Sequence, residues 1–209
     1  MIAVIDYGMG NLRSVQKALE AVGAKAVVTR DSEVIIKSDS IVLPGVGAFK
    51  DCMANLKRLN LVDPICRIIE DGKPFLGICL GLQVLFDESE EYGPVAGLGI
   101  LGGKVVRFPN GSSELGSDIP MKIPHMGWNK VEVKKKSPLF ETMDTKRYFY
   151  FVHSYHVVPE DPDIIATVTH YGLEFVSGIQ YKNIYAFQFH PEKSQALGLS
   201  ILERFSRLN

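Results

Sequence analysis

Hydrophobic positions in the first 90 residues follow two alternating patterns. Four short stretches are apolar without interruption, at residues 2–5, 26–28, 41–43 and 75–78. Short continuous runs of this kind are typical of strands that helices cover on both faces. Apolar residues at helical spacing predict helices at residues 12–22, 52–59, 61–69 and 80–86. Strands that alternate with helices predict an α/β fold with a mostly parallel open sheet flanked by helices.

Polar and small residues mark the ends of the first helix. Asn11 stands where its side chain can cap the helix, and Gly23 is a natural stop. Asp71 and Gly72 end the helix at 61–69 in a similar way. These residues support the predicted boundaries between helices and strands.

The pattern changes after Glu91, where glycine and proline become frequent. Short β-branched runs follow at residues 105–106, 131–133, 148–152, 164–168 and 175–179. They predict strands joined by turns, added to the parallel sheet as antiparallel partners. A last strand is predicted at 184–189 and a closing helix at 194–208. No repeat or linker interrupts the chain, so we expect a single domain over residues 1–209.

Composition and charge narrow the class of protein. Hydrophobic residues make up 46% and charged residues 22% of the 209 positions, as in ordinary globular proteins. The 23 basic and 24 acidic residues give a net charge of -1, so we expect no nucleic-acid partner. No signal peptide is recognisable, and no apolar stretch reaches the roughly 20 residues that span a bilayer. A cytoplasmic protein without membrane contact is therefore expected.

Three cysteines occur in the chain, at Cys52, Cys66 and Cys79. An odd number without C-x-x-C spacing predicts neither a disulfide framework nor a metal site. Cys52 and Cys66 lie within apolar helical patterns and are expected to be small core residues. Cys79 differs because glycines flank it where a strand meets a helix.

The stretch Gly77-Ile78-Cys79-Leu80-Gly81 has the pattern of a nucleophile elbow. Glycines two residues before and after the cysteine allow a sharp strand-to-helix turn. Such a turn lies at the carboxyl edge of a parallel sheet, where open α/β sheets place their sites. The N–H groups at the start of the following helix favour a thiolate and a developing oxyanion.

A cysteine nucleophile needs a base, and the base needs an orienting group. His190 ends the apolar run at 186–189 and is followed by Pro191 and Glu192. It is therefore expected to meet Cys79 at the same sheet edge, with the Glu192 carboxylate fixing its tautomer. A surface position at a strand end is expected for the other four histidines, His125, His153, His156 and His170.

Three separated motifs resemble those of the class I, triad-type glutamine amidotransferases. They are the Pro-Gly loop at 43–47, the cysteine elbow at 77–81 and Phe-His-Pro-Glu at 189–192. The resemblance covers essentially the whole chain and implies a flavodoxin-like sheet. Within this class, the segments at 6–12, 44–49, 124–129 and 151–155 resemble the glutaminase subunits of imidazole glycerol phosphate synthase.

This resemblance implies a Cys-His-Glu triad that hydrolyses L-glutamine to glutamate and ammonia. Cys79 forms a thioester with the substrate, His190 acts as base and acid, and Glu192 orients His190. The backbone N–H groups of Val46 and Leu80 are expected to form the oxyanion hole. Glycines on both sides of Val46 would let that peptide rotate, so the hole could be completed by a signal from a partner.

The resemblance also implies sites for substrate and partner. Glutamine is expected to bind at Gly45, Gly47, Gln83, Glu91, Ser154 and Tyr155. The ammonia is expected to pass to a (β/α)₈-barrel cyclase subunit in a heterodimer of histidine biosynthesis. Interface positions carried over in the same way are Asn11, Trp128, Tyr150 and Lys193, with a core position as the alternative for Trp128. No cofactor is implied.

Three other functions are compatible with parts of the sequence pattern. A glutaminase subunit of pyridoxal-phosphate synthase shares the order of the triad, but the Pro-Gly-Val-Gly loop and the turn at 127–129 favour the first interpretation. Another cysteine hydrolase of the same fold would be distinguished by its failure to turn over free glutamine. A non-catalytic interaction subunit would have no need of Cys79, His190 and Glu192 together.

Overall fold

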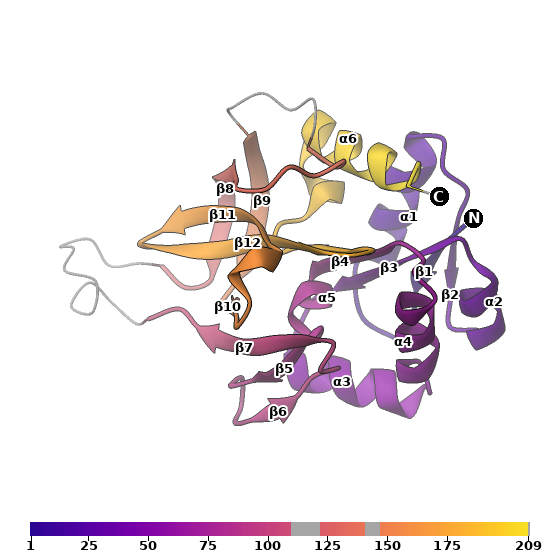
Figure 1. The fold of residues 1–209 in the computed structure, drawn as a ribbon, viewed down its shortest axis with the longest axis horizontal. Helices are drawn as coiled ribbons and strands as arrows, with labels where there is room; N and C mark the ends of the chain where they lie inside the picture. Colours follow the sequence, from indigo (N-terminus) through magenta and orange to yellow (C-terminus); the bar gives the residue numbers. More distant parts are fainter. Residues whose placement is uncertain (110–121, 141–146, 209) are drawn as a thin grey trace.

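The computed structural model describes residues 1–109, 122–140 and 147–208. These residues form a 13-stranded sheet flanked by helices (Figure 1). The strands are β1 (Ile2–Ile5), β2 (Ala26–Thr29), β3 (Ser40–Gly45), β4 (Phe75–Cys79), β5 (Phe86–Ser89), β6 (Val95–Ala96), β7 (Leu101–Arg107), β8 (His125–Val133), β9 (Arg147–His153), β10 (Tyr155–Pro159), β11 (Ile165–Tyr171), β12 (Leu173–Tyr181) and β13 (Ile184–Phe187). The helices are α1 (Leu12–Ala21), α2 (Ser32–Lys37), α3 (Phe49–Arg58), α4 (Val62–Glu70), α5 (Leu80–Gln83) and α6 (Gln195–Phe205), with 3₁₀ turns η2 (Pro162–Ile164) and η3 (Pro191–Lys193).

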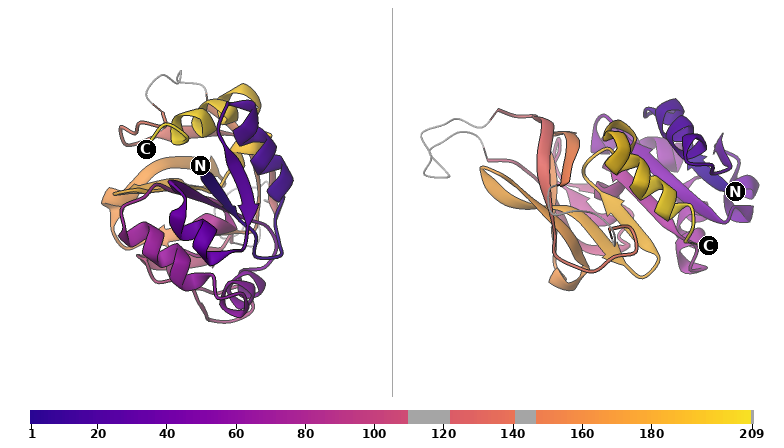
Figure 2. Two further views of the ribbon diagram at one scale, coloured as in Figure 1. Left: turned by 90° about the vertical axis from the view of Figure 1, so that its right-hand side faces the viewer. Right: turned by 90° about the horizontal axis from the view of Figure 1, so that it is seen from above.

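One half of the sheet is parallel, in the order β2-β1-β3-β4-β13, and combines the first four strands with the last one. Successive residues of β1 belong to opposite sides of the sheet, because side chains alternate along a strand. Ala3 and Ile5 join a core cluster with α2, α3 and α4, whereas Ile2 and Val4 join a second cluster with α1 and α6. Helices thus cover both faces, and α1 and α6 lie side by side in the two views of Figure 2.

The C-terminal half adds mainly antiparallel strands, as predicted. β12 pairs with β13, and β10 and β7 continue the sheet outward. β11, β8 and β9 branch from β12 as a second antiparallel ribbon (Figure 1). β4 lies between the parallel strands β3 and β13. The segments that follow β3 and β13 therefore lie beside the carboxyl end of β4. The predicted mostly parallel α/β sheet with antiparallel additions is confirmed.

Several local predictions were wrong. The helix predicted at 80–86 ends at Gln83, and Phe86 already begins β5. The strand predicted at 184–189 ends at Phe187, and the turn predicted around Trp128 is part of the long strand β8. Asn11 does occupy the N-cap position of α1, but its side chain makes no capping hydrogen bond. The pattern also missed α2, β5, β6 and β10.

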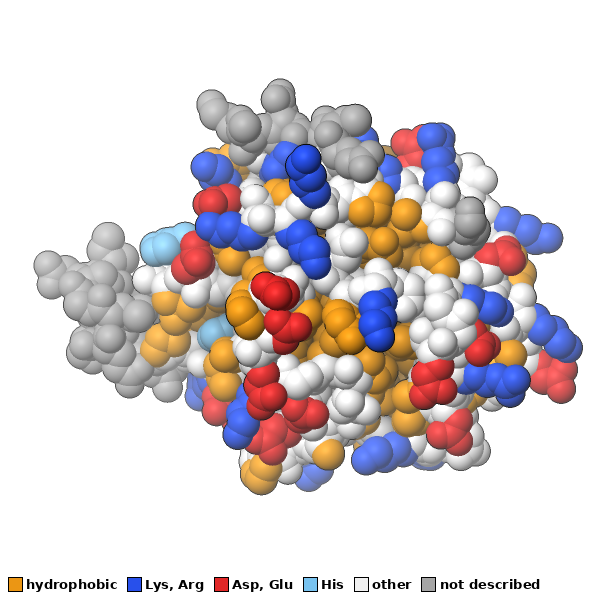
Figure 3. All heavy atoms as spheres, in the orientation of Figure 1, with side chains coloured by type: hydrophobic (Ala, Val, Ile, Leu, Met, Phe, Trp, Pro, Cys, Tyr) orange, Lys and Arg blue, Asp and Glu red, His pale blue; other side chains and the backbone are white. Residues whose placement is uncertain are grey.

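Charged side chains of both signs are intermixed on the face shown in Figure 3. This distribution agrees with the near-zero net charge of -1. Within the described ranges, no helix is long and apolar enough to cross a membrane.

Candidate active site

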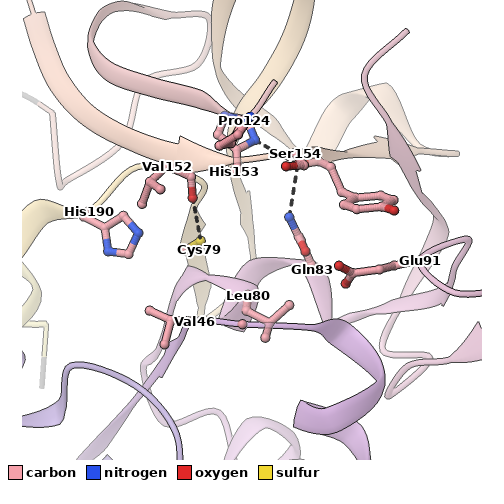
Figure 4. Close-up of a pocket in the computed structure, with 12 residues that line it drawn as sticks. Val46, Cys79, Leu80, Gln83, Glu91, Pro124, Val152, His153, Ser154 and His190 are labelled. Atoms are coloured by element: carbon pink, nitrogen blue, oxygen red, sulfur yellow. Dashed lines mark hydrogen bonds between the residues drawn. The ribbon is translucent and has the colours of Figure 1, made fainter. Parts of the chain in front are cut away.

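Cys79 is the last residue of β4 and directly precedes α5. Its backbone has φ of 56° and ψ of -106°, a conformation that non-glycine residues seldom adopt. This strained turn aims the side chain away from the sheet and into a pocket (Figure 4). The elbow predicted from the glycine pattern is therefore present in the fold.

Two glycines make the elbow possible by close approach of the backbone. A Cβ atom on Gly81 would lie 1.9 Å from the carbonyl oxygen of Leu43 in β3. A Cβ atom on Gly77 would lie 2.5 Å from the carbonyl oxygen of Gly81 itself. Both distances are far below van der Waals contact, so α5 can pack against β3 and β4 only when these side chains are absent. This packing fixes the position of Cys79.

His190 and Glu192 form a buried pair beside Cys79. The Nδ1 atom of His190 lies 2.8 Å from Oε1 of Glu192, and the two side chains are 2% and 1% exposed. The His190 N–H donates to the carbonyl of Tyr150 at 2.9 Å, which ties the segment after β13 to β9. Ser194 donates to the His190 carbonyl at 2.6 Å. Hydrogen bonds to both the side chain and the backbone of His190 thus hold the imidazole in place.

The electrostatics of this pair favour a charged imidazole. Burial works against that form, but Cys79 and Glu192 outweigh burial and raise the pKa of His190 to about 10. Among the described residues, Nε2 of His190 has no hydrogen-bond partner. Figure 4 shows the His190 ring beside Cys79. With Nδ1 directed to Glu192, Nε2 is the nitrogen left to exchange a proton with the sulfur.

A pocket of about 340 Å³ opens at Cys79. It is lined by Val46, Gly47, Cys79, Leu80, Gln83, Glu91, Pro124, Val152, His153, Ser154, Tyr155 and His190. Nine of these were predicted from the sequence, and Pro124, Val152 and His153 were not. Two predicted residues lie just outside the lining: Gly45 packs against Leu80, and Glu192 contacts His190.

Glu91 connects the pocket to helix α3. Its Oε2 atom accepts a hydrogen bond of 2.7 Å from the backbone N–H of Phe49, the first residue of α3. A carboxylate at this position also complements the positive end of the helix dipole. Because α3 starts two residues after Gly47, Glu91 helps to hold the loop that contains Val46.

Comparison with known proteins agrees with this geometry. The family model described as "Glutamine amidotransferase class-I" matches residues 3–207. The chain belongs to the class-I glutamine amidotransferase family. The family predicted from the three sequence motifs is therefore confirmed.

Curated relatives narrow the family further. The chain is 57% identical over 205 residues to "Imidazole glycerol phosphate synthase subunit HisH" of Aquifex aeolicus, covering 98% of this chain and 95% of the relative. It is 53% identical over 207 residues to the protein of the same name from Geobacter sulfurreducens, covering 99% and 98%. At this identity and coverage the amidotransferase belongs to the HisH family, as the sequence segments predicted.

Solved structures give independent support for the fold alone. A crystal structure described as a glutamine amidotransferase superposes with a TM-score of 0.70 at 18% identity, covering 98% of each chain. The structure of PurLQS from Thermotoga maritima gives a TM-score of 0.69 at 22% identity, covering 98% of this chain and 94% of that one.

Three of the four residues predicted at the partner interface of the amidotransferase lie near the triad. Trp128 and Tyr150 are cross-strand neighbours on β8 and β9, with ring centroids 6.3 Å apart. The Lys193 ammonium lies 5.6 Å from the Tyr150 ring, one residue after Glu192. Trp128 is 47% exposed, so its alternative as a core aromatic is wrong. Asn11 is exposed at the start of α1.

Three histidines expected at the surface are buried: His125, His153 and His156. His125 and His153 are hydrogen-bonded to each other, with Nδ1 of His125 2.9 Å from Nε2 of His153. His153 then contacts the Tyr155 carbonyl at 2.8 Å through Nδ1, so this nitrogen carries the proton. No sequence pattern indicated this pair, because its members are 28 residues apart.

The buried histidine pair predicts acid sensitivity. Burial lowers the pKa of His125 to about 4 and that of His153 to about 3. In the unfolded chain both titrate near 6.5, so protons bind the unfolded state first as pH falls. We expect the free energy of unfolding to drop by about 1–2 kcal/mol for each histidine between pH 7 and pH 5. Urea unfolding at both pH values measures this drop.

A His125→Phe variant isolates the effect, because phenylalanine keeps the ring stacking on Tyr171. We expect this variant to lose less stability than the parent chain between pH 7 and pH 5. His190 contributes with the opposite sign, since the stability from its raised pKa is fully present below pH 6.5 and declines as the pH rises toward 10. The contribution of His190 is the same in the parent chain and in His125→Phe, so it cancels when the two are compared. The exposed His170 offers the control, as His170→Gln should leave the loss unchanged. Equal losses in the parent and His125→Phe would contradict the prediction.

Proposed function

We propose that this chain is the glutaminase subunit of an imidazole glycerol phosphate synthase, with Cys79, His190 and Glu192 as its catalytic triad. The observation that carries the proposal is the strained elbow at Cys79 beside the buried His190–Glu192 pair. Each of these groups suits one step of amide hydrolysis, and the relatives that share this chain's whole length bear the corresponding name.

The reaction begins when the Cys79 sulfur attacks the side-chain amide carbon of glutamine. The proton of the Cys79–His190 pair lies on Nε2 of His190 during this attack, and the C–N bond then breaks as His190 gives that proton to the departing ammonia. Glu192 holds Nδ1 and stabilises the imidazolium that forms in between. A γ-glutamyl thioester remains. Water attacks it with His190 as base, which releases glutamate and restores Cys79.

The tetrahedral intermediates carry an oxyanion that needs two N–H donors. Leu80 supplies one by its position directly after the nucleophile, at the start of α5. Val46 supplies the second from the loop after β3, which lies beside Cys79 because Gly45 pairs with Cys79 across the sheet. Figure 4 draws Val46 and Leu80 together on one side of Cys79. Each such donor contributes about 3–4 kcal/mol to transition-state stabilisation.

Glutamine binds in the pocket with its amide at Cys79 and its amino-acid end toward Glu91. The Glu91 carboxylate attracts the α-ammonium group, and Gly45, Gly47, Gln83, Ser154 and Tyr155 shape the site around the chain of the substrate. The pocket volume of about 340 Å³ suits a ligand of amino-acid size.

The ammonia passes to a (β/α)₈-barrel cyclase subunit in a cytoplasmic heterodimer. Ammonia released to water would be protonated and lose its nucleophilicity, so a partner must receive it directly. Trp128, Tyr150 and Lys193 form the contact surface, and Asn11 contributes from α1. Residues 1–209 act as one domain without a cofactor, which the continuous sheet supports.

The experiment is to measure glutamate release with and without the barrel subunit bound to its nucleotide ligand. We expect the barrel subunit to raise the rate by about tenfold or more, through coupling between the two sites. Trp128→Ala should weaken the stimulation. Val158→Ala is the matched control, since Val158 is also 47% exposed but lies on β10. Glutaminase activity that ignores the barrel subunit would leave the triad intact and refute the synthase assignment.

A further inference from the structure

Gln188 is a fully buried amide that none of the roles above uses. It follows β13, two residues before His190, and its side chain is 0% exposed. Burying a primary amide is unfavourable unless its polar atoms are hydrogen-bonded. Here both atoms have partners: Oε1 lies 3.0 Å from Nε2 of Gln83, and Nε2 lies 3.5 Å from the sulfur of Cys79.

The orientation of this amide is set by a backbone carbonyl. Nε2 of Gln83 donates to the Tyr155 carbonyl at 3.1 Å, and a carbonyl oxygen can only accept. Gln83 must therefore place its NH₂ group toward Tyr155, and the same group reaches Oε1 of Gln188. With Oε1 occupied, the NH₂ group of Gln188 is left to face Cys79. The Tyr155 carbonyl thus determines which group donates and which accepts in every hydrogen bond from Gln83 to Cys79.

His153 strengthens that fixed point from the other side. Its Nδ1 atom also donates to the Tyr155 carbonyl, at 2.8 Å. Two donors hold the same oxygen, and both come from buried side chains. The Tyr155 carbonyl therefore cannot turn away without leaving two buried donors unpaired.

We propose that Gln188 is a positioning residue that donates a hydrogen bond to the Cys79 sulfur, fixes its rotamer and favours its thiolate form. The inference rests on the proposed glutaminase function for its consequence in catalysis. A hydrogen bond to the charged form of an acid favours ionisation. Donors to an anion are also stronger than donors to a neutral acceptor. The Val152 carbonyl, 3.9 Å from the sulfur, can accept a hydrogen bond only from the thiol form.

Catalysis benefits from this hydrogen bond because the reactive sulfur is a thiolate, which can accept hydrogen bonds but not donate them. During attack the sulfur must present a lone pair to the substrate carbon, while His190 holds the proton. The Gln188 N–H occupies a second direction around the sulfur and moves no proton. It therefore supports the thiolate in every cycle without competing with His190.

The test replaces Gln188 by methionine, which has similar volume and no N–H donor. Iodoacetamide alkylation of Cys79 is followed against pH by mass spectrometry of its peptide, since Cys52 and Cys66 are also free. We expect the alkylation midpoint to rise by about one pH unit, equivalent to the net contribution of one charge-assisted hydrogen bond. The kcat for glutamine should fall about tenfold with KM nearly unchanged.

Two further variants keep the result interpretable. Gln83→Met leaves Gln188 in place but removes the donor that orients it, so a smaller shift in the same direction is expected even if Gln188→Met fails to fold. Gln16→Met is the control, because the Gln16 amide bonds only to α1 and to Ala26 among the described residues. An unchanged alkylation midpoint in folded Gln188→Met or Gln83→Met overturns the inference.

Alkylation separates this inference from the proposed function, because it requires no glutamine. A shifted midpoint in a chain that releases no glutamate even with the barrel subunit bound would support the role of Gln188 and refute the glutaminase. An unshifted midpoint in a chain that does release glutamate would overturn the role of Gln188 and support the glutaminase. A purely structural role of Gln188 would lower stability without moving the pH profile.

Discussion

Cys79→Ala is expected to lower glutamate release by about 10⁴-fold or more. Alanine removes the only atom that can form the thioester, and no other cysteine lines the pocket. The Cys52 thiol is buried away from it, and burial raises the pKa of Cys52 to about 12, so it cannot substitute as nucleophile. Coupled measurement of glutamate over hours gives the required sensitivity.

The triad also predicts strong non-additivity. His190→Ala should cost nearly as much as Cys79→Ala, because a sulfur without its base is seldom in the reactive form. The Cys79→Ala/His190→Ala double variant should be no slower than either single variant, since both changes disable the same step. Circular dichroism and urea unfolding serve as the control for folding. Residual turnover in Cys79→Ala at more than about a hundredth of the parent rate would exclude the covalent mechanism.

The sequence was most informative where a residue type has few structural uses. A cysteine between glycines, at the end of an apolar strand, has one common explanation, and the φ of 56° at Cys79 agrees with it. His190 and Glu192 could be paired from their spacing because they are two residues apart. The alternation of apolar strands and amphipathic helices similarly predicted the parallel half of the sheet.

The pattern failed where tertiary contacts decide the structure. Residues 80–86 are all buried, so no polar face marks where a helix would end. The chain leaves α5 after Gln83 because later segments bond to it: Leu98 donates to the Val84 carbonyl and Ile100 to the Leu85 carbonyl. Such long-range partners have no local signature.

Buried polar side chains were missed for the same reason. Gln188 stands in an apolar run, and a polar residue in such a run is itself a signal of a buried partner. That partner, Gln83, lies 105 positions away and cannot be identified without the fold. Residues that line the pocket, such as His153, are likewise brought to the site by pairing of β8 with β9. The strand-to-helix elbow was therefore predictable from the sequence, but its surrounding hydrogen bonds were not.

The packing of the elbow leads to the second large effect, in stability. Gly81→Ala is expected to lower the free energy of unfolding by about 3 kcal/mol, at the upper end of overpacking costs. The new Cβ would lie 1.9 Å from the Leu43 carbonyl oxygen, which is a backbone atom. No side chain can rotate to make room, so α5 must move away from β3. Urea unfolding measures the loss.

Gly102→Ala provides a control with the same chemical change. Its Cβ would lie 2.9 Å from Oε2 of Glu160, the far end of an exposed and flexible side chain. Glu160 can turn into solvent, so we expect a loss below about 1 kcal/mol. If Gly81→Ala and Gly102→Ala unfold at the same urea concentration, close backbone packing does not hold the elbow. A large loss in Gly81→Ala alone, together with reduced glutamate release, would show that the geometry of Cys79 depends on the contact between α5 and β3.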